Sequence, residues 1–388
     1  MAVALETKTY DVGGVLLERP FKVRRLGHFG YNVNELAAAE HFYVDLLGFR
    51  KSDLGASFNA IFLHHGGDHH SLLIRQYGPQ EVRKNDVTVN QITWQLGSLR
   101  EVNDAHHWLQ DQGVPMQRVG RDMPGSNWHT YFNDPDSHTN ELYYGIEQIG
   151  WDGHSKPQSM YYRRFSEEPV LPQMSEADEI EQARENGIDV NSGFRYLERG
   201  GDYEVDGVLL ARPFKITKIG PVRLFVKDLA ASEAFYLNDM GFAKTEETTY
   251  KGQRCVFLRT NTEHHSLALY PVALRSELGL REDTSCMSFG VQLATYRQLR
   301  DAVRFLRDKG CTVRELDPAL FAGMGHQAFA FDPDGHAIQL YHYMEQVGWD
   351  GRPRPAHLRH EIRQGAWPES VSAEPDSFGG EVFLGPWG

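Results

Sequence analysis

The sequence lacks several features that would place it in a whole class of proteins. No apolar run reaches the roughly 20 residues that a membrane-spanning helix needs. The segment from Met1 to Tyr10 does not have the charged-then-apolar layout of a secretory signal. The net charge of −13 argues against nucleic acid as a partner, because phosphate-binding surfaces need an excess of basic residues. We therefore expect a cytoplasmic protein that forms a homo-oligomer and acts without membrane or nucleic acid.

Cysteine is scarce as well. The three cysteines, Cys255, Cys286 and Cys311, all lie in the second half and are not spaced like a disulfide framework or a zinc site. We expect them to be reduced thiols in the core. The remaining composition, 40% apolar and 24% charged, is typical of a globular protein. A chain of 388 residues exceeds the size of one ordinary hydrophobic core, so two or more domains are expected.

An internal repeat organises the chain. Five motifs of the first half return in the same order in the second half, with only a small drift in spacing. The matched segments are 14–22 and 207–215, 42–49 and 235–242, 69–72 and 264–267, 134–136 and 332–334, and 147–153 and 345–351. The repeat indicates that the chain is an internal duplication.

Each half divides again into two similar units. Apolar spacing predicts a helix over Glu35–Leu47 that ends at Gly48, and alternation predicts the strands around it. A second helix is expected over Leu99–Gln110. The predicted strands of the first half are Val23–Val33, Phe58–His64, Ser71–Tyr77, Val89–Leu96, Met116–Val119, His129–Asn133 and Thr139–Tyr144. The fold class is therefore α+β, with four tandem βαβββ modules.

The rest of the chain connects or follows the two halves. We expect domains at 1–150 and 206–350, a linker at 151–205 and an extended tail at 351–388. The linker is rich in Pro, Ser and acidic residues, with one helical stretch near Ser175–Asn186. The Pro, Gly and Arg residues of the tail indicate that it lies over the surface.

Four such modules in a row, with a helix that ends in Phe-Tyr-x(4)-Gly-Phe, resemble the vicinal oxygen chelate superfamily. Within it, the chain is most similar to the two-domain extradiol ring-cleaving dioxygenases. The resemblance covers about Phe21–Gly150 and Phe214–Trp349. It implies that paired modules curl into half-open barrels, each able to hold a metal ion between its first and last strands. It does not select one reaction, because glyoxalases, epimerases, resistance proteins and thiol transferases share the superfamily.

The resemblance also implies a ligand set in the first half. The family's two His ligands and one Glu fall on His28, Gln91 and Glu141. Gln91 departs from the pattern of two His and one carboxylate that suits Fe(II) and O₂, although a Gln oxygen can bind a divalent ion, as it does in lyase and isomerase members. In the second half the matching residues are Pro221, about Ser288, and Gln339. We therefore expect a metal in the first half only.

Further candidates surround this set. His70 matches the family's acid–base His, although His264-His265 in the other half also favours a plain strand start. His129 and Tyr131 share one face of a strand. They either face the substrate or form ordinary pairs on the sheet. Trp94, Trp128 and Tyr143 are candidates for a substrate pocket or for core packing. The family's other active-site His is absent, since its place falls near Asp122 or Met123.

These residues favour an Fe(II) enzyme that opens a dihydroxylated aromatic ring with O₂. Mn(II) or another divalent ion is the alternative to Fe(II). Gln91 instead favours a metal-dependent isomerase, epimerase or lyase, with Glu141 or His70 as the base. A glyoxalase would need a fourth ligand near Leu73 or Ile74, which are apolar. A third alternative is a protein that binds an aromatic metabolite without turnover.

Overall fold

The computed structural model describes residues 8–55, 59–78, 88–121, 125, 127–163, 166–348, 350–373 and 377–378. Its first half begins with a hairpin of β1 (Tyr10–Val12) and β2 (Val15–Leu17). An eight-stranded sheet follows, in the order β4-β5-β6-β3-β7-β10-β9-β8. These strands are β3 (Arg25–Val33), β4 (Arg50–Leu54), β5 (Ala60–His64), β6 (Leu72–Gln76), β7 (Val89–Gln95), β8 (Met116–Arg121), β9 (Trp128–Asn133) and β10 (Thr139–Tyr144). The helices are α1 (Leu36–Glu40), which continues as a π-helical turn (His41–Leu46), and α2 (Leu99–Asp111).

The second half repeats this plan element by element. Its sheet has the order β14-β15-β16-β13-β17-β20-β19-β18, with the same parallel and antiparallel pairs. The strands are β11 (Tyr203–Val205), β12 (Val208–Leu210), β13 (Ile216–Val226), β14 (Ala243–Tyr250), β15 (Gln253–Arg259), β16 (Leu267–Pro271), β17 (Cys286–Leu293), β18 (Val313–Arg314), β19 (Gln327–Phe331) and β20 (Ala337–Tyr341). The helices are α4 (Leu229–Ala234) with a π-helical turn (Phe235–Asp239), α5 (Leu274–Glu277) and α6 (Tyr296–Asp308). The predicted α+β fold of four modules in two paired half-barrels is thus confirmed.

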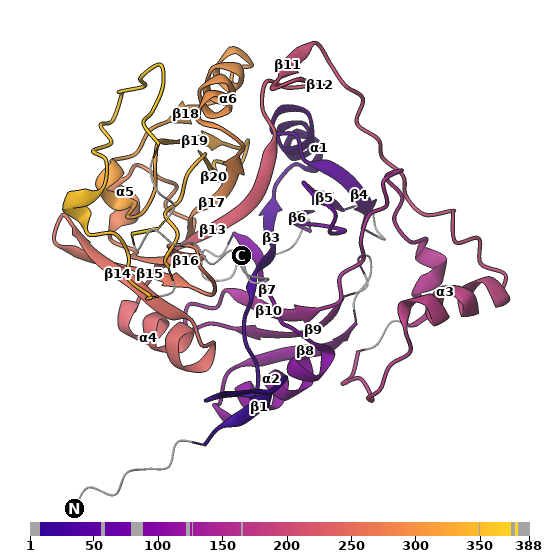
Figure 1. The fold of residues 1–388 in the computed structure, drawn as a ribbon. Helices are drawn as coiled ribbons and strands as arrows, with labels where there is room; N and C mark the ends of the chain where they lie inside the picture. The colour runs from indigo at the N-terminus through magenta and orange to yellow at the C-terminus, as the bar shows by residue number, and fades with distance from the viewer. Residues whose placement is uncertain are drawn as a thin grey trace, which may run out of the picture.

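The linker and the tail carry little regular structure. The linker has a 3₁₀ turn (Gln158–Arg163) and α3 (Glu176–Glu185), which begins after Ser175 and lies at the right of Figure 1. A 3₁₀ turn (Pro318–Leu320) precedes β19, and another (Ala356–Leu358) lies in the tail. Within the described residues, every helix is too short or too polar to cross a membrane. Cys255 and Cys286 are buried free thiols whose pKa is raised by burial to about 12, and Cys311 is a half-buried free thiol.

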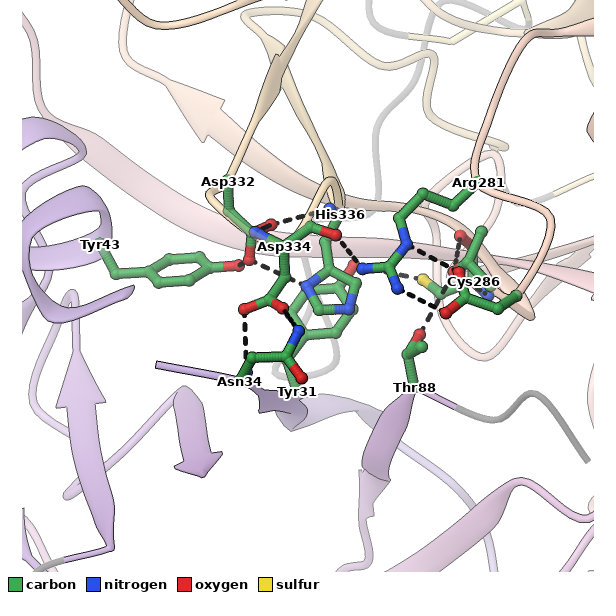
Figure 2. Close-up of polar contacts among 11 residues, drawn as sticks. Tyr31, Asn34, Tyr43, Thr88, Arg281, Cys286, Asp332, Asp334 and His336 are labelled. Atoms are coloured by element: carbon green, nitrogen blue, oxygen red, sulfur yellow. Dashed lines mark hydrogen bonds and ion pairs between the residues drawn. The ribbon is translucent and has the colours of Figure 1, made fainter. Parts of the chain in front are cut away.

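The two halves share one continuous core, since the largest apolar cluster contains strands and helices of both. The polar contacts across this core come in matched pairs. The Tyr43 hydroxyl donates to Asp332 at 2.9 Å, and Tyr236 donates to Asp134 at the same distance. Figure 2 shows the first of these contacts, with Asn34 bonded to Asp334 close by. Each half therefore buries its outer sheet face and its first helix against the other half.

Candidate functional site

Three neighbouring strands bring the predicted ligands together. β3 lies antiparallel to β7, with His28 opposite Thr93, and β7 lies parallel to β10, with Thr93 opposite Glu141. Gln91 is two residues before Thr93, so both side chains leave the same face of β7. That face is the concave one, and all four side chains are buried. The module repeat explains this placement, because the first strands of the two modules are adjacent at the centre of the sheet.

The Glu141 carboxylate lies at the centre of the cluster. A 3.1 Å hydrogen bond joins its Oε2 to His28 Nε2, and the same oxygen accepts hydrogen bonds from Gln91 at 3.1 Å and from the Thr93 hydroxyl at 2.8 Å. The other oxygen, Oε1, accepts a 2.6 Å hydrogen bond from Asn127. His28, Gln91 and Glu141 thus converge on one point inside the first half.

Glu141 remains ionised despite complete burial. Burial by itself raises the pKa of a carboxyl group, but the charge and hydrogen bond of His28, with further contributions from His129 and Thr93, lower the pKa of Glu141 to about 2. A buried carboxylate that keeps its charge is a strong binding group for a cation.

Rings cover His28 on two sides. The His70 ring lies 4.2 Å from the His28 ring, between centroids, and the Tyr143 ring lies 5.2 Å from it. Burial, together with the charges of His28 and His69, lowers the pKa of His70 well below its usual value, so His70 is a neutral base at pH 7. Its Nδ1 is 3.0 Å from His69 Nδ1, and His69 Nε2 is 3.8 Å from Asp53. His70 therefore lies beside the ligand set without joining it.

His129 and Tyr131 lie on β9, whose Tyr131 pairs directly with Glu141 of β10. Both side chains are buried on the same concave face, with their rings 4.6 Å apart, and the Arg118 guanidinium lies 4.2 Å from the Tyr131 ring. They lie in the same interior as His28 and Glu141. Asp122 and Met123, near the place of the family's other active-site His, lie outside the described residues.

The pocket prediction needs correction for two of the three aromatic residues. Trp94 lies on the opposite face of β7 from Gln91, where it packs against Phe242 at 4.8 Å and donates to Asn140 at 2.9 Å. Trp128 precedes His129, so it leaves the other face of β9, and it lines a cavity beneath α3. Strand alternation is the reason in both cases. Tyr143, by contrast, is in the interior beside His28.

Sequence reasoning missed Thr93 and Asn127, which both donate to Glu141. The signal for them was alternation, since Thr93 stands two residues after Gln91 and Asn127 stands two residues before His129. Leu73 of β6 lies opposite Gly30, next to the ligand set, so the position of a glyoxalase-type fourth ligand is apolar.

The second half has other residues at these positions. The strand registers are the same in both halves, with Gln339 opposite Gly290 and Arg223 opposite Ser288. The matched pairs are His28 and Pro221, Gln91 and Ser288, Glu141 and Gln339, His70 and His265, and Gly30 and Arg223. At these positions of the described second half, other residue types therefore stand in place of the candidate ligands.

Arg223 extends into the interior of the second half. Its guanidinium is buried and donates to Gln339 at 2.5 Å, and its nitrogens lie 3.4 Å from the Ser288 hydroxyl and 3.0 Å from His265 Nε2. It also lies 5.1 Å from the Phe321 ring. These partners are the counterparts of Glu141, Gln91 and His70, so a fixed side-chain cation occupies the position that corresponds to the first half's candidate metal position.

The donor set of the first half fits a divalent metal of intermediate hardness, because it combines an imidazole nitrogen, a carboxylate and an amide oxygen. Nε2 of Gln91 faces Glu141, and a rotation of the amide by 180° would present the oxygen instead. In the described part of the chain, no three His, Cys, Asp or Glu side chains form a metal-binding group. A third protein ligand at this site would therefore be Gln91.

The chain belongs to the glyoxalase/bleomycin resistance protein/dioxygenase superfamily. The family model matches residues 25–142 and 218–340, more than half of the chain and both repeats. No curated protein matches the sequence significantly.

Solved structures share the two-domain fold at low sequence identity. The 2,3-dioxygenase LapB from Pseudomonas sp. KL28 is 15% identical with a TM-score of 0.58, over 85% of this chain and 95% of that one. A catechol 2,3-dioxygenase is 17% identical with a TM-score of 0.55, over 91% and 97%. The Mn(II)-bound glyoxalase from Novosphingobium aromaticivorans is 16% identical with a TM-score of 0.56, over 85% of each chain. At these identities the likeness establishes the fold alone.

Proposed function

We propose that the protein is a metal-dependent dioxygenase of the extradiol type, which opens a dihydroxylated aromatic ring with O₂. The observation that carries the proposal is the convergence of His28, Gln91 and Glu141 on one buried point, with a neutral His70 beside it. Among proteins of this fold, dioxygenases such as LapB and the catechol 2,3-dioxygenase support the same reaction class. We also propose that the protein is cytoplasmic and forms a homo-oligomer.

His28 Nε2, a Glu141 oxygen and the Gln91 amide oxygen would hold the ion, Fe(II) in our proposal, with Mn(II) or another divalent ion as the alternative. A divalent ion with three protein ligands supplies Lewis acidity and open coordination positions for substrate oxygens. Thr93 and Asn127 hold the carboxylate in place through hydrogen bonds of 2.8 and 2.6 Å. Such partners fix the orientation of a ligand before it binds.

His70 is the residue we assign to proton transfer. Because its pKa is held well below the usual value, it is neutral at pH 7 and has one unprotonated ring nitrogen that can accept a hydrogen bond from a substrate hydroxyl. His129 and Tyr131 provide further polar groups on the same interior face, and Tyr143 limits the space around His28. These four residues bind or orient the aromatic substrate in our proposal.

Gln91 favours a second candidate, a metal-dependent isomerase, epimerase or lyase. Such a reaction needs only a polarised carbonyl and a proton shift, for which His70 or Glu141 would serve as the base. The apolar Leu73 argues against the four-ligand glyoxalase arrangement within this class.

The test combines metal analysis of anaerobically purified protein with O₂ uptake on a panel of catechols and hydroquinones. About one Fe for each chain together with O₂ uptake supports the dioxygenase. Another divalent ion without O₂ uptake would favour the isomerase or lyase, and protein without metal would leave only a binding role.

Paired variants locate the metal. His28→Ala should lose the bound metal, whereas Pro221→Ala, at the matched position in the second half, should keep it. Full metal content in His28→Ala would disprove the site.

A further inference from the structure

A cavity of about 230 Å³, the junction cavity, lies where three parts of the chain meet. The first half provides the turn after α1, the start of β4 and the residue after β5. The linker provides residues 198–200, and the second half provides residues 209–216 without Pro213. Figure 1 shows the β11–β12 hairpin beside α1, at the top. The volume is below the about 300–1,000 Å³ of sites for drug-sized ligands, so the cavity suits a smaller one.

Positive charge is in excess on the walls of the junction cavity. The charged residues of the lining are Arg50, Arg199, Arg212, Lys215 and Glu198. Glu198 forms an ion pair with Arg212. In the part of the chain that the structure describes, the other three cations form no ion pair with a carboxylate. The whole chain carries a net charge of −13, so three uncompensated cations around one cavity depart from its general balance.

Arg212 is a fixed part of the wall. It is buried, and its guanidinium donates to the backbone carbonyl of Asp45 at 3.0 Å and pairs with Glu198. It packs on Gly48, which has a φ of +92° and where a Cβ would lie 2.5 Å from Arg212 Nε. The first half, the linker and the second half are therefore joined at this point, and the cavity is built by the fold of this chain.

Arg50 has donors left for a ligand. Its side chain is half-buried, and among the described residues its one hydrogen bond runs from Nη2 to the backbone carbonyl of His65, at 3.3 Å. A guanidinium has five N–H donors, so most of them remain available. Burial lowers the pKa of Arg50, because its charge has lost water without gaining a carboxylate partner. Arg199 and Lys215 are exposed, so their long side chains can reach a ligand in the cavity.

Two carboxylates near the junction cavity, outside its lining, have other partners. Asp45 Oδ2 is 2.7 Å from His41 Nδ1, and Asp68 forms an ion pair with Arg25 at 2.9 Å. Burial lowers the pKa of His65, in the lining, to about 4, and the cations around it act in the same direction. His65 is therefore neutral at pH 7 and adds no charge of either sign.

The repeat provides a comparison for these cations. Lys22 is the counterpart of Lys215 in the repeated motif. Ala243 stands at the position of Arg50, since each is the first residue of the matching strand. Arg50 is therefore not required by the fold of the repeat.

We propose that the junction cavity binds a small dianionic oxyanion of the phosphate type, held by Arg50, Arg199 and Lys215. Arginine and lysine side chains bind phosphate oxygens through charge-assisted hydrogen bonds. Free phosphate and the phosphate group of a small ester offer the same oxygens to these residues. The bound anion would contact both halves and the linker, so it would raise the unfolding temperature of the whole chain. This site needs neither the metal nor the proposed reaction.

The test is calorimetric titration of the full chain, treated with a chelator to remove metal, with inorganic phosphate and with methyl phosphate at constant ionic strength. We expect about one phosphate to bind to each chain, with a Kd of about 0.1–1 mM. Tighter binding of inorganic phosphate would identify the free ion as the ligand. Tighter binding of methyl phosphate would identify an ester, and either result supports the oxyanion site.

Variants locate the bound anion. Arg50→Ala introduces the residue of the matched strand and should weaken phosphate binding roughly tenfold, because charge-assisted hydrogen bonds are lost. Lys215→Met should weaken it by a similar factor, whereas Lys22→Met, at the matched lysine, should leave it unchanged.

Lys215→Glu keeps the test decisive if Arg50→Ala folds poorly, because Lys215 is exposed and its replacement leaves the core intact. This variant should abolish phosphate binding. No binding to the parent protein at about 10 mM phosphate, or binding that Lys215→Glu does not affect, would overturn the proposal. Because the metal is absent throughout, these results do not depend on the proposed dioxygenase activity.

Discussion

Replacing Glu141 by Gln should destabilise the metal-free protein in a way that depends on pH. The amide has the same shape and can still accept the hydrogen bonds from His28, Gln91 and Thr93 through its oxygen, but it has no charge. Its NH₂ group would face Asn127, whose own amide can rotate to present an oxygen. The variant therefore removes the ionic part of the cluster and little else.

The pKa shift of Glu141 gives the magnitude of the expected loss of stability. It falls from the ordinary 4.5 to about 2 in the folded protein, where burial is outweighed by the charge and hydrogen bond of His28. That difference corresponds to about 3 kcal/mol of native-state stability at pH 7. Because the folded-state pKa is the lower one, the contribution is complete above about pH 5 and is lost as the pH falls toward 2. The gap between parent and Glu141→Gln should narrow to about 2 kcal/mol at pH 3.5.

The assay is equilibrium urea unfolding of chelator-treated protein at both pH values. Glu369→Gln serves as the control, because this side chain is 95% exposed and its loss should change stability by less than about 0.5 kcal/mol. A Glu141→Gln variant as stable as the parent at pH 7, or a gap that stays constant between the two pH values, would refute the reasoning.

Three further predictions follow from the contacts of the two halves. Gln91→His should tighten Fe(II) or Zn(II) binding roughly tenfold or more in competition titrations, since imidazole suits these ions better than an amide oxygen does; unchanged affinity would argue against a ligand role. Arg223→Ala should lower the free energy of unfolding by about 2–4 kcal/mol, because buried acceptors lose their donor, while the metal content stays as in the parent. Tyr43→Phe should cost about 1–3 kcal/mol through the lost hydrogen bond to the Asp332 side chain, and thermal unfolding should show a similar loss for Tyr236→Phe.

The fold could be predicted from the sequence because the motifs of the first half return in the second half. Some elements were missed nonetheless. β4 reads Arg-Lys-Ser-Asp-Leu, without apolar alternation, and its buried residues are Ser52 and Asp53. The hairpins β1–β2 and β11–β12 turn at Gly13-Gly14 and Asp206-Gly207, where all four residues have positive φ. These dipeptides are signals for a tight hairpin turn and could have been recognised.

For the candidate site, strand alternation predicts which face of the sheet each side chain leaves. Gln91 and Trp94 are three residues apart on one strand and must leave opposite faces, so the position of Trp94 outside the interior followed from the sequence. The role of Arg223 could not be foreseen in this way. It depends on a long side chain that replaces Gly30 and reaches across two strands to Gln339 and His265.

The interiors of the two halves also differ next to the positions of the ligand set. Next to the ligand set, the first half has a polar cluster in which Arg75 and Asn90 both donate to Asn32. At the matched positions the second half has Tyr270, Met287 and Phe225, which belong to an apolar core of their own.

Beside its buried Arg223, the second half thus has apolar surface that contributes about 25 cal/mol for each Å² buried, whereas the polar cluster of the first half contributes little hydrophobic stabilisation. The second half therefore supplies stability from its own core and from the core it shares with the first half. The first half can then keep buried charge at Glu141 in its interior, where it would bind metal. On this argument, mutations in the apolar interior of the second half should reduce metal retention in the first half without touching any ligand.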